Sequence, residues 1–522
     1  ALEKSDTVTV KSMTDMEIEA RGKVLKNHER WFERLDKLKT EDHFETYVNS
    51  FVNVFGPHTS YFAPKGKEDF DIRMSGQLEG IGARLQQKDG EIKVTEIVPG
   101  SPSYLQGDLE VEDIILKVAE GDDEPTDLSD MLLNEAVRYI RGKKGTEARL
   151  TVRKIDGSTQ SIAIIRDVVV NKETYAKSAV VKQNDGKKIG YIKLPKFYSD
   201  FGRNGKVGRN CADDVKAELE KLNEENVDGV VLDLRNNGGG SLYDVVKMTG
   251  LFIERGPIVQ VKSPGVEPKI MHDRDSDVVY DGPLVVMVNE CSASASEILA
   301  AAIQDYGRGI VVGSTHTFGK GTVQRFIDFD RMLPDRYNDI KPLGAIKMTQ
   351  QKFYRVNGGS TQLKGVSSDI VLPDTYAYIE TGEAENEYVM PWDKIPAAKY
   401  KKWQADFDIN EVIRNSNSRI KSNSSFQLID KTAKEMKTQR DITSFSLNYK
   451  QHKKEIDVLN ELTDELDVLD EPINGLEVVN LEVDMGEIKS DTILTRINKD
   501  WITALEKDIY LSETVFVIED MN

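Results

Sequence analysis

Residues 284–299 read LVVMVNECSASASEIL and join an apolar strand to an apolar helix. The run Leu284–Val288 has the continuity of a strand that is buried on both faces, as in layered α/β cores. Three serines, Ser292, Ser294 and Ser296, alternate with alanines where the strand passes into the helix. A serine at such an elbow exposes its hydroxyl beside the free N–H groups of the helix start, which can stabilise an oxyanion. The stretch therefore predicts an α/β core that carries a candidate serine nucleophile.

The choice among the three serines depends on where the helix starts. Ser296 suits the capping position, because Glu297 then lies in the first turn. Ser294 is then just outside the helix, with its hydroxyl facing a cleft and the N–H of Ala295 able to donate to an oxyanion. Serine-rich helix starts are common, so capping and packing by all three serines is the alternative. Cys291 is expected to be a small buried hydrophobe.

A lysine between two glycines follows in the segment FGKGT at 318–322. Flanking glycines allow close approach of the backbone and are a poor context for a solvated lysine. Lys320 can therefore act as a base toward a serine if burial lowers its pKa. Gln324, four residues further on, could bond to the ammonium and orient it. An exposed loop lysine is the alternative.

Asp305 follows Ser294 by eleven residues, which is about three helical turns and nearly the same face of the helix. Its distance along the helix predicts a role in orientation or structure rather than in proton transfer. A carboxylate near a helix C-terminus opposes the helix dipole, so pairing with Arg308 is the alternative.

A glycine-rich loop, NNGGG at 236–240, follows an apolar strand at 229–234. Its backbone could supply a second donor to an oxyanion. A phosphate cradle is the alternative, but neither a Walker lysine nor a G-x-G-x-x-G spacing follows the loop.

Six histidines are present, and His316 precedes Lys320 in the same loop. A Ser–His–Asp triad that uses His316 stays open, since triad partners meet in space and not in sequence. His58 follows a proline in a turn and is expected to bond locally. No paired histidine or cysteine spacing indicates a metal site, and no cofactor is expected.

The 522-residue chain has a formal net charge of −19 at pH 7. Its length predicts about two to four domains, and its acidity disfavours a nucleic-acid partner. The sequence contains no run of about 18 apolar residues, the length needed to span a membrane. The start, Ala1-Leu2-Glu3-Lys4, is not a signal peptide, so the protein is cytosolic or the numbering begins after processing or truncation. Two cysteines are too few for a disulfide scaffold.

The spacing of apolar residues divides the chain into four regions. Residues 1–75 are expected to be helical, with apolar faces over 12–55 that should pack against other domains. Residues 76–155 read as short strands with one late helix, and 156–373 as the alternating strands and helices of a layered α/β core. Residues 374–522 are charged and mainly helical.

The second region begins with a glycine-rich approach to a strand. A groove between that strand and the late helix would take an extended peptide by strand addition, and loop N–H groups can hold a terminal carboxylate. The region resembles a PDZ domain of the permuted bacterial type; an unrelated small α+β domain is the alternative. The candidates for binding the carboxylate are Glu79, Gly80, Ile81 and Gly82.

Several strings together resemble the tail-specific (C-terminal processing) proteases, and among them the long periplasmic type with a PDZ domain. They are SASASEI at 292–298, QDYGR at 304–308, TFGKGTVQ at 317–324, PHTSY at 57–61, LEGIGA at 78–83, DLRNNGGG at 233–240, QKFYRVNGGSTQ at 351–362 and PWD at 391–393. The resemblance covers residues from about 12 to about 450. It implies an α+β multidomain protein. Its layered α/β serine-protease core, of the ClpP/crotonase type, carries an inserted PDZ-like domain and helical N- and C-terminal regions.

The resemblance also implies roles for individual residues. Ser294 is the expected nucleophile and Lys320 the expected general base. Gln324 falls where the family orients the lysine, and Asp305 falls on a position implicated in activity. The expected oxyanion donors are the N–H of Ala295 and of one glycine of the pair Gly239 and Gly240. The serine-to-lysine spacing of 26 is one above the common pattern, which a bulge could absorb. The N-terminal helical region looks shorter than in long members, as after truncation or processing.

The implied activity is a serine endopeptidase that selects proteins by unstructured, apolar C-terminal tails, with or without an adaptor protein. The implied location is the periplasm, with membrane association open. Two alternatives differ in chemistry: a catalytically inactive PDZ scaffold or peptide-binding protein, and a Ser–His hydrolase that uses His316.

Overall fold

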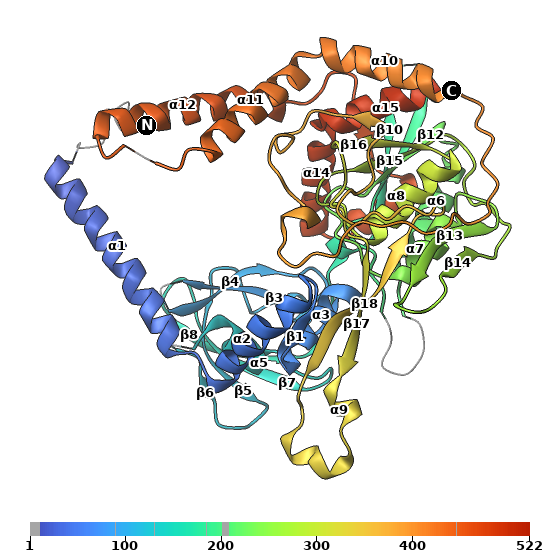
Figure 1. The fold of residues 1–522 in the computed structure, drawn as a ribbon. Helices are drawn as coiled ribbons and strands as arrows, with labels where there is room; N and C mark the ends of the chain where they lie inside the picture. Colours follow the sequence, from blue (N-terminus) through green and yellow to red (C-terminus); the bar gives the residue numbers. More distant parts are fainter. Residues whose placement is uncertain (1–10, 89, 130, 184, 201–207, 445) are drawn as a thin grey trace. The chain divides into compact units, whose positions relative to one another are not determined.

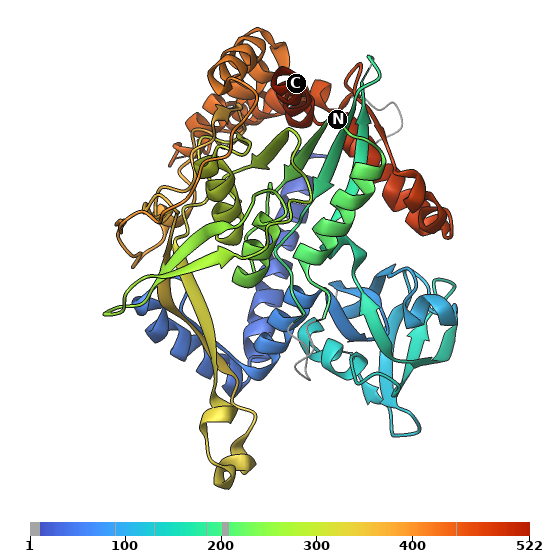
Figure 2. The ribbon, with the colours of Figure 1, turned by 90° about the vertical axis from the view of Figure 1, so that its right-hand side faces the viewer.

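The computed structural model describes the chain except for residues 1–10, 89, 130, 184, 201–207 and 445, so Ala1-Leu2-Glu3-Lys4 lies outside the described residues. Internal contacts divide the chain into two compact units. One comprises Ala1–Phe51 and Glu79–Val169, and the other comprises Val52–Leu78 and Val170–Asn522. Figures 1 and 2 trace the elements of each unit.

A seven-stranded sheet forms the centre of the larger unit. Its strands, in spatial order, are β19 (Ile370–Val371), β16 (Ile310–Gly313), β15 (Leu284–Val288), β12 (Gly229–Asp233), β11 (Lys188–Lys193), β10 (Lys177–Lys182) and β20 (Glu477–Val479). The strands from β19 to β11 are parallel, whereas β10 and β20 each run antiparallel to their neighbour. The strands expected in this core are confirmed, because continuous apolar runs suit strands that are covered on both faces.

Helices cover both faces of this sheet. On one face lie α6 (Cys211–Glu224), α7 (Leu242–Thr249) and α8 (Ala295–Tyr306), and on the other α10 (Ile409–Ser422), α11 (Ser424–Arg440), α14 (Thr492–Glu506) and α15 (Ile509–Met521). Val230 and Leu232 point into the first core and Val231 into the second, since side chains alternate along a strand. The layered α/β core is thus confirmed.

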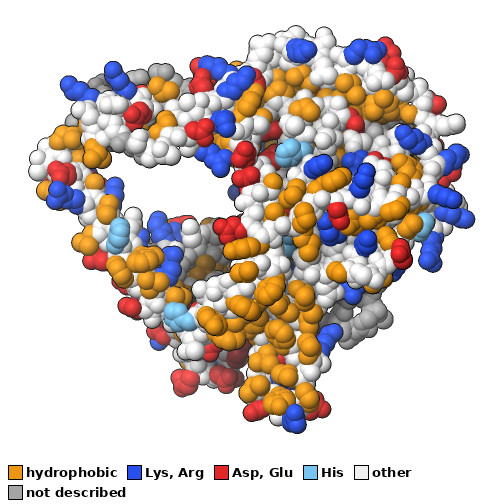
Figure 3. Space-filling model, viewed as in Figure 1, with side chains coloured by type: hydrophobic (Ala, Val, Ile, Leu, Met, Phe, Trp, Pro, Cys, Tyr) orange, Lys and Arg blue, Asp and Glu red, His pale blue; other side chains and the backbone are white. Residues whose placement is uncertain are grey.

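A second, antiparallel sheet holds the segment that follows Lys320. Its strands are β1 (Ser60–Phe62), β18 (Ala345–Tyr354), β13 (Gly256–Lys262) and β14 (Lys269–Asp273), with β17 (Thr322–Asp328) paired to β18. The hairpin β17–β18 carries α9 (Phe329–Met332) at its tip, where Met332 and Ile340 are 65% and 52% exposed. Figure 3 shows apolar side chains gathered over this hairpin. The sequence did not predict it, because its strands are mostly half-buried and show no clean alternation.

The smaller unit is built on a six-stranded sheet. Its strands are β3 (Ala83–Lys88), β4 (Glu91–Ile97), β5 (Ile114–Glu120), β7 (Glu147–Arg153) and β8 (Thr159–Ile165), with β6 (Thr126–Asp127) on β5. It also contains α4 (Pro102–Gln106) and α5 (Leu133–Ile140). The expected strands and late helix are present with shifted ends, and β8 adds a strand beyond the one expected to close the unit.

The N-terminal helices form as predicted but bury almost nothing. They are α1 (Met13–Asp36), which has no buried residue, and α2 (Thr40–Val52), which buries Val52. Trp31 and Phe32 are 53% and 57% exposed, and the packing of these apolar faces against other domains stays a prediction. Among the described helices, none combines the length and apolarity that a membrane crossing requires.

The remaining elements link or extend these layers. They are α3 (Pro64–Ser75), the paired strands β2 (Gln77–Gly80) and β9 (Asp167–Val170), α12 (Tyr449–Leu466), α13 (Met485–Ile488) and the short 3₁₀ turn η5 (Glu383–Glu385).

The packing of α15 on the central sheet gives a stability prediction. Leu511 is fully buried in the core beneath α15, whereas Val483 is 67% exposed. Leu511→Ala should lower the free energy of unfolding of the larger unit by about 2–5 kcal/mol, because it leaves a cavity. Val483→Ala should change it by less than about 0.5 kcal/mol. Equal denaturation midpoints for the two variants would contradict this role of α15.

Candidate active site

The serine elbow lies where β15 runs into α8. Ser294 is the N-cap residue of α8, and its backbone has φ +58° and ψ −110°, a conformation that is uncommon for a residue with a side chain. The helix begins at Ala295, so the expectation that Ser296 caps it is wrong. The reason is Glu297, whose carboxylate accepts the Ser294 N–H at 2.7 Å and so makes Ser294 the first residue of a capping-box pattern.

The neighbouring serines have structural roles. The hydroxyl of Ser292 donates to the Leu234 carbonyl at 2.8 Å, and that of Ser296 donates to the Asn237 carbonyl at 2.8 Å. Both serines are fully buried. Ser294 is partly exposed, and in the described part of the chain its hydroxyl donates to no other group. Of the three serines, Ser294 is thus the one that is not buried and whose hydroxyl is not used as a donor within the described residues.

Cys291, in the same turn, does not behave as expected. It is exposed rather than buried, because it lies on the outer side of the turn before the serine elbow. The other cysteine, Cys211, is buried at the start of α6.

The buried carboxylate of Glu297 joins the serine elbow to the lysine loop. Its Oε1 accepts the Thr317 hydroxyl and the Gly319 N–H, each at 2.7 Å. Its Oε2 accepts the N–H of Ser294 at 2.7 Å and of Lys320 at 3.0 Å. Two nitrogens bonded to one oxygen can be no more than about 6 Å apart, so the backbones of the two predicted catalytic residues are held together. Burial raises the pKa of Glu297 to about 7, although its hydrogen bonds oppose the shift.

Sequence reasoning placed Glu297 in the first helical turn and missed this second role. The available signal was the Ser294-x-x-Glu297 spacing, which is that of a capping box. The bonds to residues 317–320 carry no sequence signal, because they join segments more than 19 residues apart.

The surroundings of Lys320 favour its neutral form. Burial and, to a smaller extent, the positive charge of Lys347 on β18 lower the pKa of Lys320 to about 8, although the charges of Glu383 and Glu297 oppose the shift. A lysine with this pKa is partly neutral near pH 8 and can accept a proton.

The glycine-rich loop lies directly against the serine elbow. A side chain at Gly239, which has φ +93°, would fall 2.7 Å from the Ala293 carbonyl and 2.7 Å from Ser294 Cβ. Only glycine allows this approach. The Gly239 N–H donates to Asn237 Oδ1 at 2.9 Å, so within the expected pair of glycines this donor is used inside the loop.

A buried charge cluster holds the start of this loop. Arg235 donates to Asp233 at 2.8 Å and to Asp508 at 2.5 Å. Burial alone would raise the pKa of Asp233, but the charges of Arg235 and Lys193 lower it below its ordinary range. Asp508 is also the N-cap of α15, so the C-terminal helix is tied to the glycine-rich loop.

Gln324 lies on β17, where its amide nitrogen donates to the hydroxyls of Thr322 at 2.8 Å and Thr349 at 3.1 Å. The strand register shifts between Val323 and Gln324. The side-chain amide is thus engaged along the β17–β18 hairpin, on the segment that immediately follows Lys320.

Asp305 lies in the last turn of α8, about 16 Å along the helix axis from the serine end. It accepts two hydrogen bonds from Arg355, at 3.0 and 2.6 Å, and one from Asn357. Pairing with Arg308 is therefore wrong, since that guanidinium is buried and donates to the carbonyls of Phe252 and Tyr280.

Neither His316 nor His58 has a contact that would make it a base toward Ser294. His316 is exposed, and its Nδ1 lies 2.8 Å from the Thr317 carbonyl. His58 does not bond locally as expected, because its Nε2 lies 2.7 Å from the carboxylate of Glu383, 325 residues away. The described residues contain no cluster of His, Cys, Asp and Glu suited to a metal ion.

The strand and helix expected to form the peptide groove are both in the smaller unit. β3 contacts α5 and lies at the edge of its sheet, where among the described strands it pairs only with β4. In the preceding loop, Ile81 and Gly82 use their carbonyls internally, accepting Ser103 N–H at 2.8 Å and Val98 N–H at 2.9 Å. Glu79 accepts the Lys144 N–H at 3.0 Å, and Gly80 ends β2.

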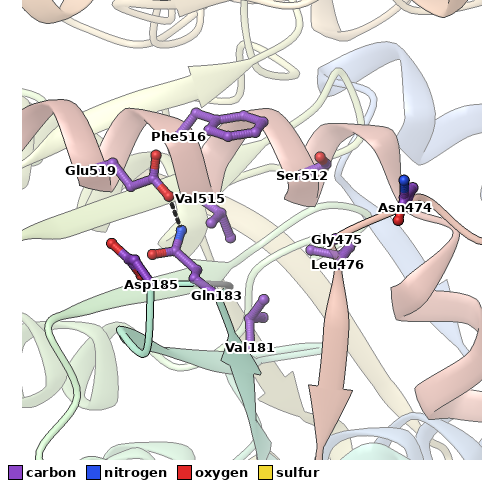
Figure 4. Close-up of a pocket in the computed structure, with 10 residues that line it drawn as sticks. All are labelled: Val181, Gln183, Asp185, Asn474, Gly475, Leu476, Ser512, Val515, Phe516 and Glu519. Atoms are coloured by element: carbon purple, nitrogen blue, oxygen red, sulfur yellow. Dashed lines mark hydrogen bonds between the residues drawn. The ribbon is translucent and has the colours of Figure 1, made fainter.

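A cavity of about 290 Å³ lies between β10, β20 and α15 (Figure 4). The side chains of Gln183 and Glu519 are hydrogen-bonded within it, and Phe516 lies along one side. None of the predicted site residues lines this cavity. Its polar lining includes the Ser512 hydroxyl and the carboxylates of Asp185 and Glu519, but neither a lysine nor a histidine.

The role of Glu297 gives a prediction that does not depend on activity. In Glu297→Gln the side-chain NH₂ replaces an accepting oxygen and faces at least one backbone N–H donor in either amide orientation, which should lower the free energy of unfolding by about 1–3 kcal/mol. Amide exchange of residues 317–320 should become faster in the same variant. Glu290→Gln is the matched control, because this partly exposed carboxylate accepts the Ser314 hydroxyl and the Cys291 thiol and no backbone N–H among the described residues. Wild-type exchange in Glu297→Gln would contradict the joining role.

Four family models match successive parts of the chain. They are the tail specific protease N-terminal domain at residues 2–65, the PDZ domain at 70–153, peptidase family S41 at 188–372 and the C-terminal domain of tail specific protease at 376–522.

Curated relatives cover most of the same range. A tail-specific protease of Haemophilus influenzae is 38% identical over 87% of this chain and 64% of its own length. The carboxy-terminal processing protease CtpA of Bacillus subtilis is 31% identical over 64% of each chain. The chain thus spans less than two thirds of these two proteins. A carboxyl-terminal-processing protease of Picosynechococcus is 32% identical over 59% of this chain and 71% of its own length.

Solved structures give further matches. The photosystem II D1 C-terminal processing protease matches with a TM-score of 0.37 and 23% identity, over 63% of this chain and 81% of that chain. A PDZ domain of a carboxy-terminal protease from Vibrio cholerae, in complex with peptide, is 31% identical over 18% of this chain and 99% of that domain, with a TM-score of 0.18. The family models and the curated relatives lead to one conclusion: the chain belongs to peptidase family S41, among the tail-specific or carboxyl-terminal-processing proteases.

Proposed function

We propose that the chain is a serine endopeptidase in which Ser294 is the nucleophile and Lys320 the general base. The observation that carries this proposal is the Glu297 carboxylate, which holds the backbones of both residues on one oxygen. Neutral Lys320 takes the Ser294 hydroxyl proton as the oxygen attacks a peptide carbonyl. The leaving amine takes up that proton, and the same lysine then activates the water that hydrolyses the acyl-enzyme.

The oxyanion donors follow from the same geometry. Ala295 is the first helical residue, so its N–H has no partner within the helix and faces the serine elbow. Gly240 is the proposed second donor, because the Gly239 N–H is bonded to Asn237. Gln324 and Asp305 take supporting roles: Gln324 fixes the strand after the lysine, and Asp305 anchors the end of α8 through Arg355.

The substrate class in this proposal is proteins with unstructured, apolar C-terminal tails. The open edge of β3 would pair with an extended tail, and the loop Glu79–Gly82 would receive its carboxylate. The family resemblance supports a periplasmic location and allows for an adaptor. We divide the protein into a helical region (1–75), a PDZ-like domain (76–155), the protease core (156–373) and a mainly helical C-terminal domain (374–522).

The first test separates the two candidate bases. Ser294→Ala and Lys320→Met should lower cleavage of an unfolded protein with an apolar tail by at least about 1,000-fold, because each removes one half of the proton transfer. His316→Ala should keep near wild-type activity, since that side chain is exposed. Product sequencing and thermal unfolding of each variant complete the measurement. Full activity in Lys320→Met, or loss of activity in His316→Ala, would overturn the assignment of the base.

The second test is the pH dependence. The base must be neutral in the free enzyme, so kcat/KM should rise with pH and level off above the pKa of Lys320, which is about 8. The midpoint of this rise should lie near pH 8, and Lys320→Met should abolish it. A midpoint near pH 10.5, the ordinary value for lysine, would mean that the site does not depress this pKa.

A further inference from the structure

The lysine loop, residues 317–321, is also held by a second set of contacts that does not involve Glu297. Gln362 Oε1 accepts the N–H of Gly321, the residue after Lys320, at 2.8 Å. The nitrogen of the same amide donates to Glu383 Oε1 at 3.0 Å. Gln362 is fully buried and Glu383 is 1% exposed, so this chain of bonds is shielded from water. Hydrogen bonds to a buried carboxylate are stronger and more directional than exposed ones.

The other oxygen of Glu383 is held by His58. The Nε2 of His58 lies 2.7 Å from Glu383 Oε2, and the imidazole is 18% exposed. Burial raises the pKa of Glu383, but the hydrogen bonds from His58 and Gln362 and the nearby positive charges outweigh it, and the net pKa lies below its ordinary value. The carboxylate is therefore ionised, with both oxygens occupied by donors.

The backbone beside Glu383 also contacts the loop. The Glu383 N–H donates to the Phe318 carbonyl at 2.8 Å. The preceding residue, Gly382, has φ +102°, and a side chain there would fall 2.5 Å from that carbonyl. The segment therefore lies against residues 318–321 with no room for a side chain between them.

The two residues of this support lie in different segments, both outside the core. His58 precedes β1, and Glu383 begins η5, beyond β19. Neither falls within residues 188–372, which match peptidase family S41. The loop that carries the proposed base is thus completed by the segments that flank the core on either side.

We propose that Glu383 is a positioning residue for Lys320: its carboxylate, held by His58, fixes the lysine loop through Gln362, and its backbone N–H holds the Phe318 carbonyl of the same loop. The inference rests on the proposed function, since positioning matters only if Lys320 is the base. On this inference, the position of the Lys320 side chain depends on the Glu383 carboxylate, which follows the core in sequence, and on His58, which precedes it.

The charge of Glu383 supplies a readout that a purely structural role would not change. The charged groups that act on Lys320 are Lys347, which lowers its pKa, and Glu383 and Glu297, which raise it. Removing the Glu383 charge should lower the pKa of Lys320 further. The midpoint of the rise of kcat/KM should then move to lower pH, even while a less well-held lysine lowers kcat.

The experiment compares Glu383→Gln and His58→Gln with the control Glu385→Gln. Glu385 lies in the same turn and is exposed. Cleavage of a tail-tagged unfolded protein and labelling of Ser294 by a fluorophosphonate are measured from pH 5.5 to 10, with thermal unfolding of each variant. In Glu383→Gln we expect kcat to fall by at least about tenfold, KM to change little and the midpoint to fall by about half a pH unit. His58→Gln should also lower kcat but should leave the midpoint near its wild-type position, because the Glu383 charge that acts on Lys320 remains. Glu385→Gln should match wild type in both quantities.

Combining Glu383→Gln with His58→Gln should add little to the larger single effect, because both act through one bond. Wild-type kcat and midpoint in Glu383→Gln would overturn the inference and leave the proposed function standing. A lower kcat in Glu383→Gln with an unchanged midpoint of the kcat/KM profile would mean that Glu383 has only a structural role, and this result would also overturn the inference. If Glu383→Gln does not fold, wild-type behaviour of His58→Gln refutes the inference. Absence of cleavage by the wild-type protein would instead count against the proposed function.

Discussion

The carboxylate of Glu297 is the interaction on which the site depends. It is buried at the start of α8 and accepts four hydrogen bonds, from the serine elbow on one side and the lysine loop on the other. A buried carboxylate is costly unless its oxygens are satisfied, so the four donors cannot move apart without leaving a buried charge unpaired. The uncommon backbone conformation of Ser294 persists because this bond network fixes it.

Two loops lie beside the serine elbow: the glycine-rich loop and the lysine loop. Each is held by a carboxylate from the C-terminal part of the chain. Asp508, at the start of α15, binds Arg235 and so holds the glycine-rich loop. Glu383, at the start of η5, binds His58 and Gln362 and so supports the lysine loop. Removing one member of such a pair leaves a buried charge, which makes these contacts specific as well as stabilising. Carboxylates of the C-terminal region thus hold both loops beside the elbow.

The sequence was most informative where local pattern and burial agree. The strands 284–288 and 310–313 are continuous apolar runs, so their existence could be predicted. Ser294 and Lys320 stand at turns with unusual composition, so the sequence could mark them as candidate site residues. The half-buried hairpin β17–β18 could not, because its residues face neither a full core nor open solvent. Ser296, Asp305 and His58 were given local partners, but each bonds across the fold, to Asn237, Arg355 and Glu383. Long-range pairs of this kind leave no period in the sequence.

The central claim is that the fold pairs Ser294 with a lysine whose pKa is lowered to about 8, so that the lysine is partly neutral near that pH. The most direct test is the titration of the Lys320 amine in the Ser294→Ala protein, by competitive acetylation at a series of pH values with mass spectrometry of the peptide that contains residue 320. Half-maximal reactivity near pH 8 is the result that the account predicts. Half-maximal reactivity near pH 10.5, the ordinary value for a lysine, would contradict it.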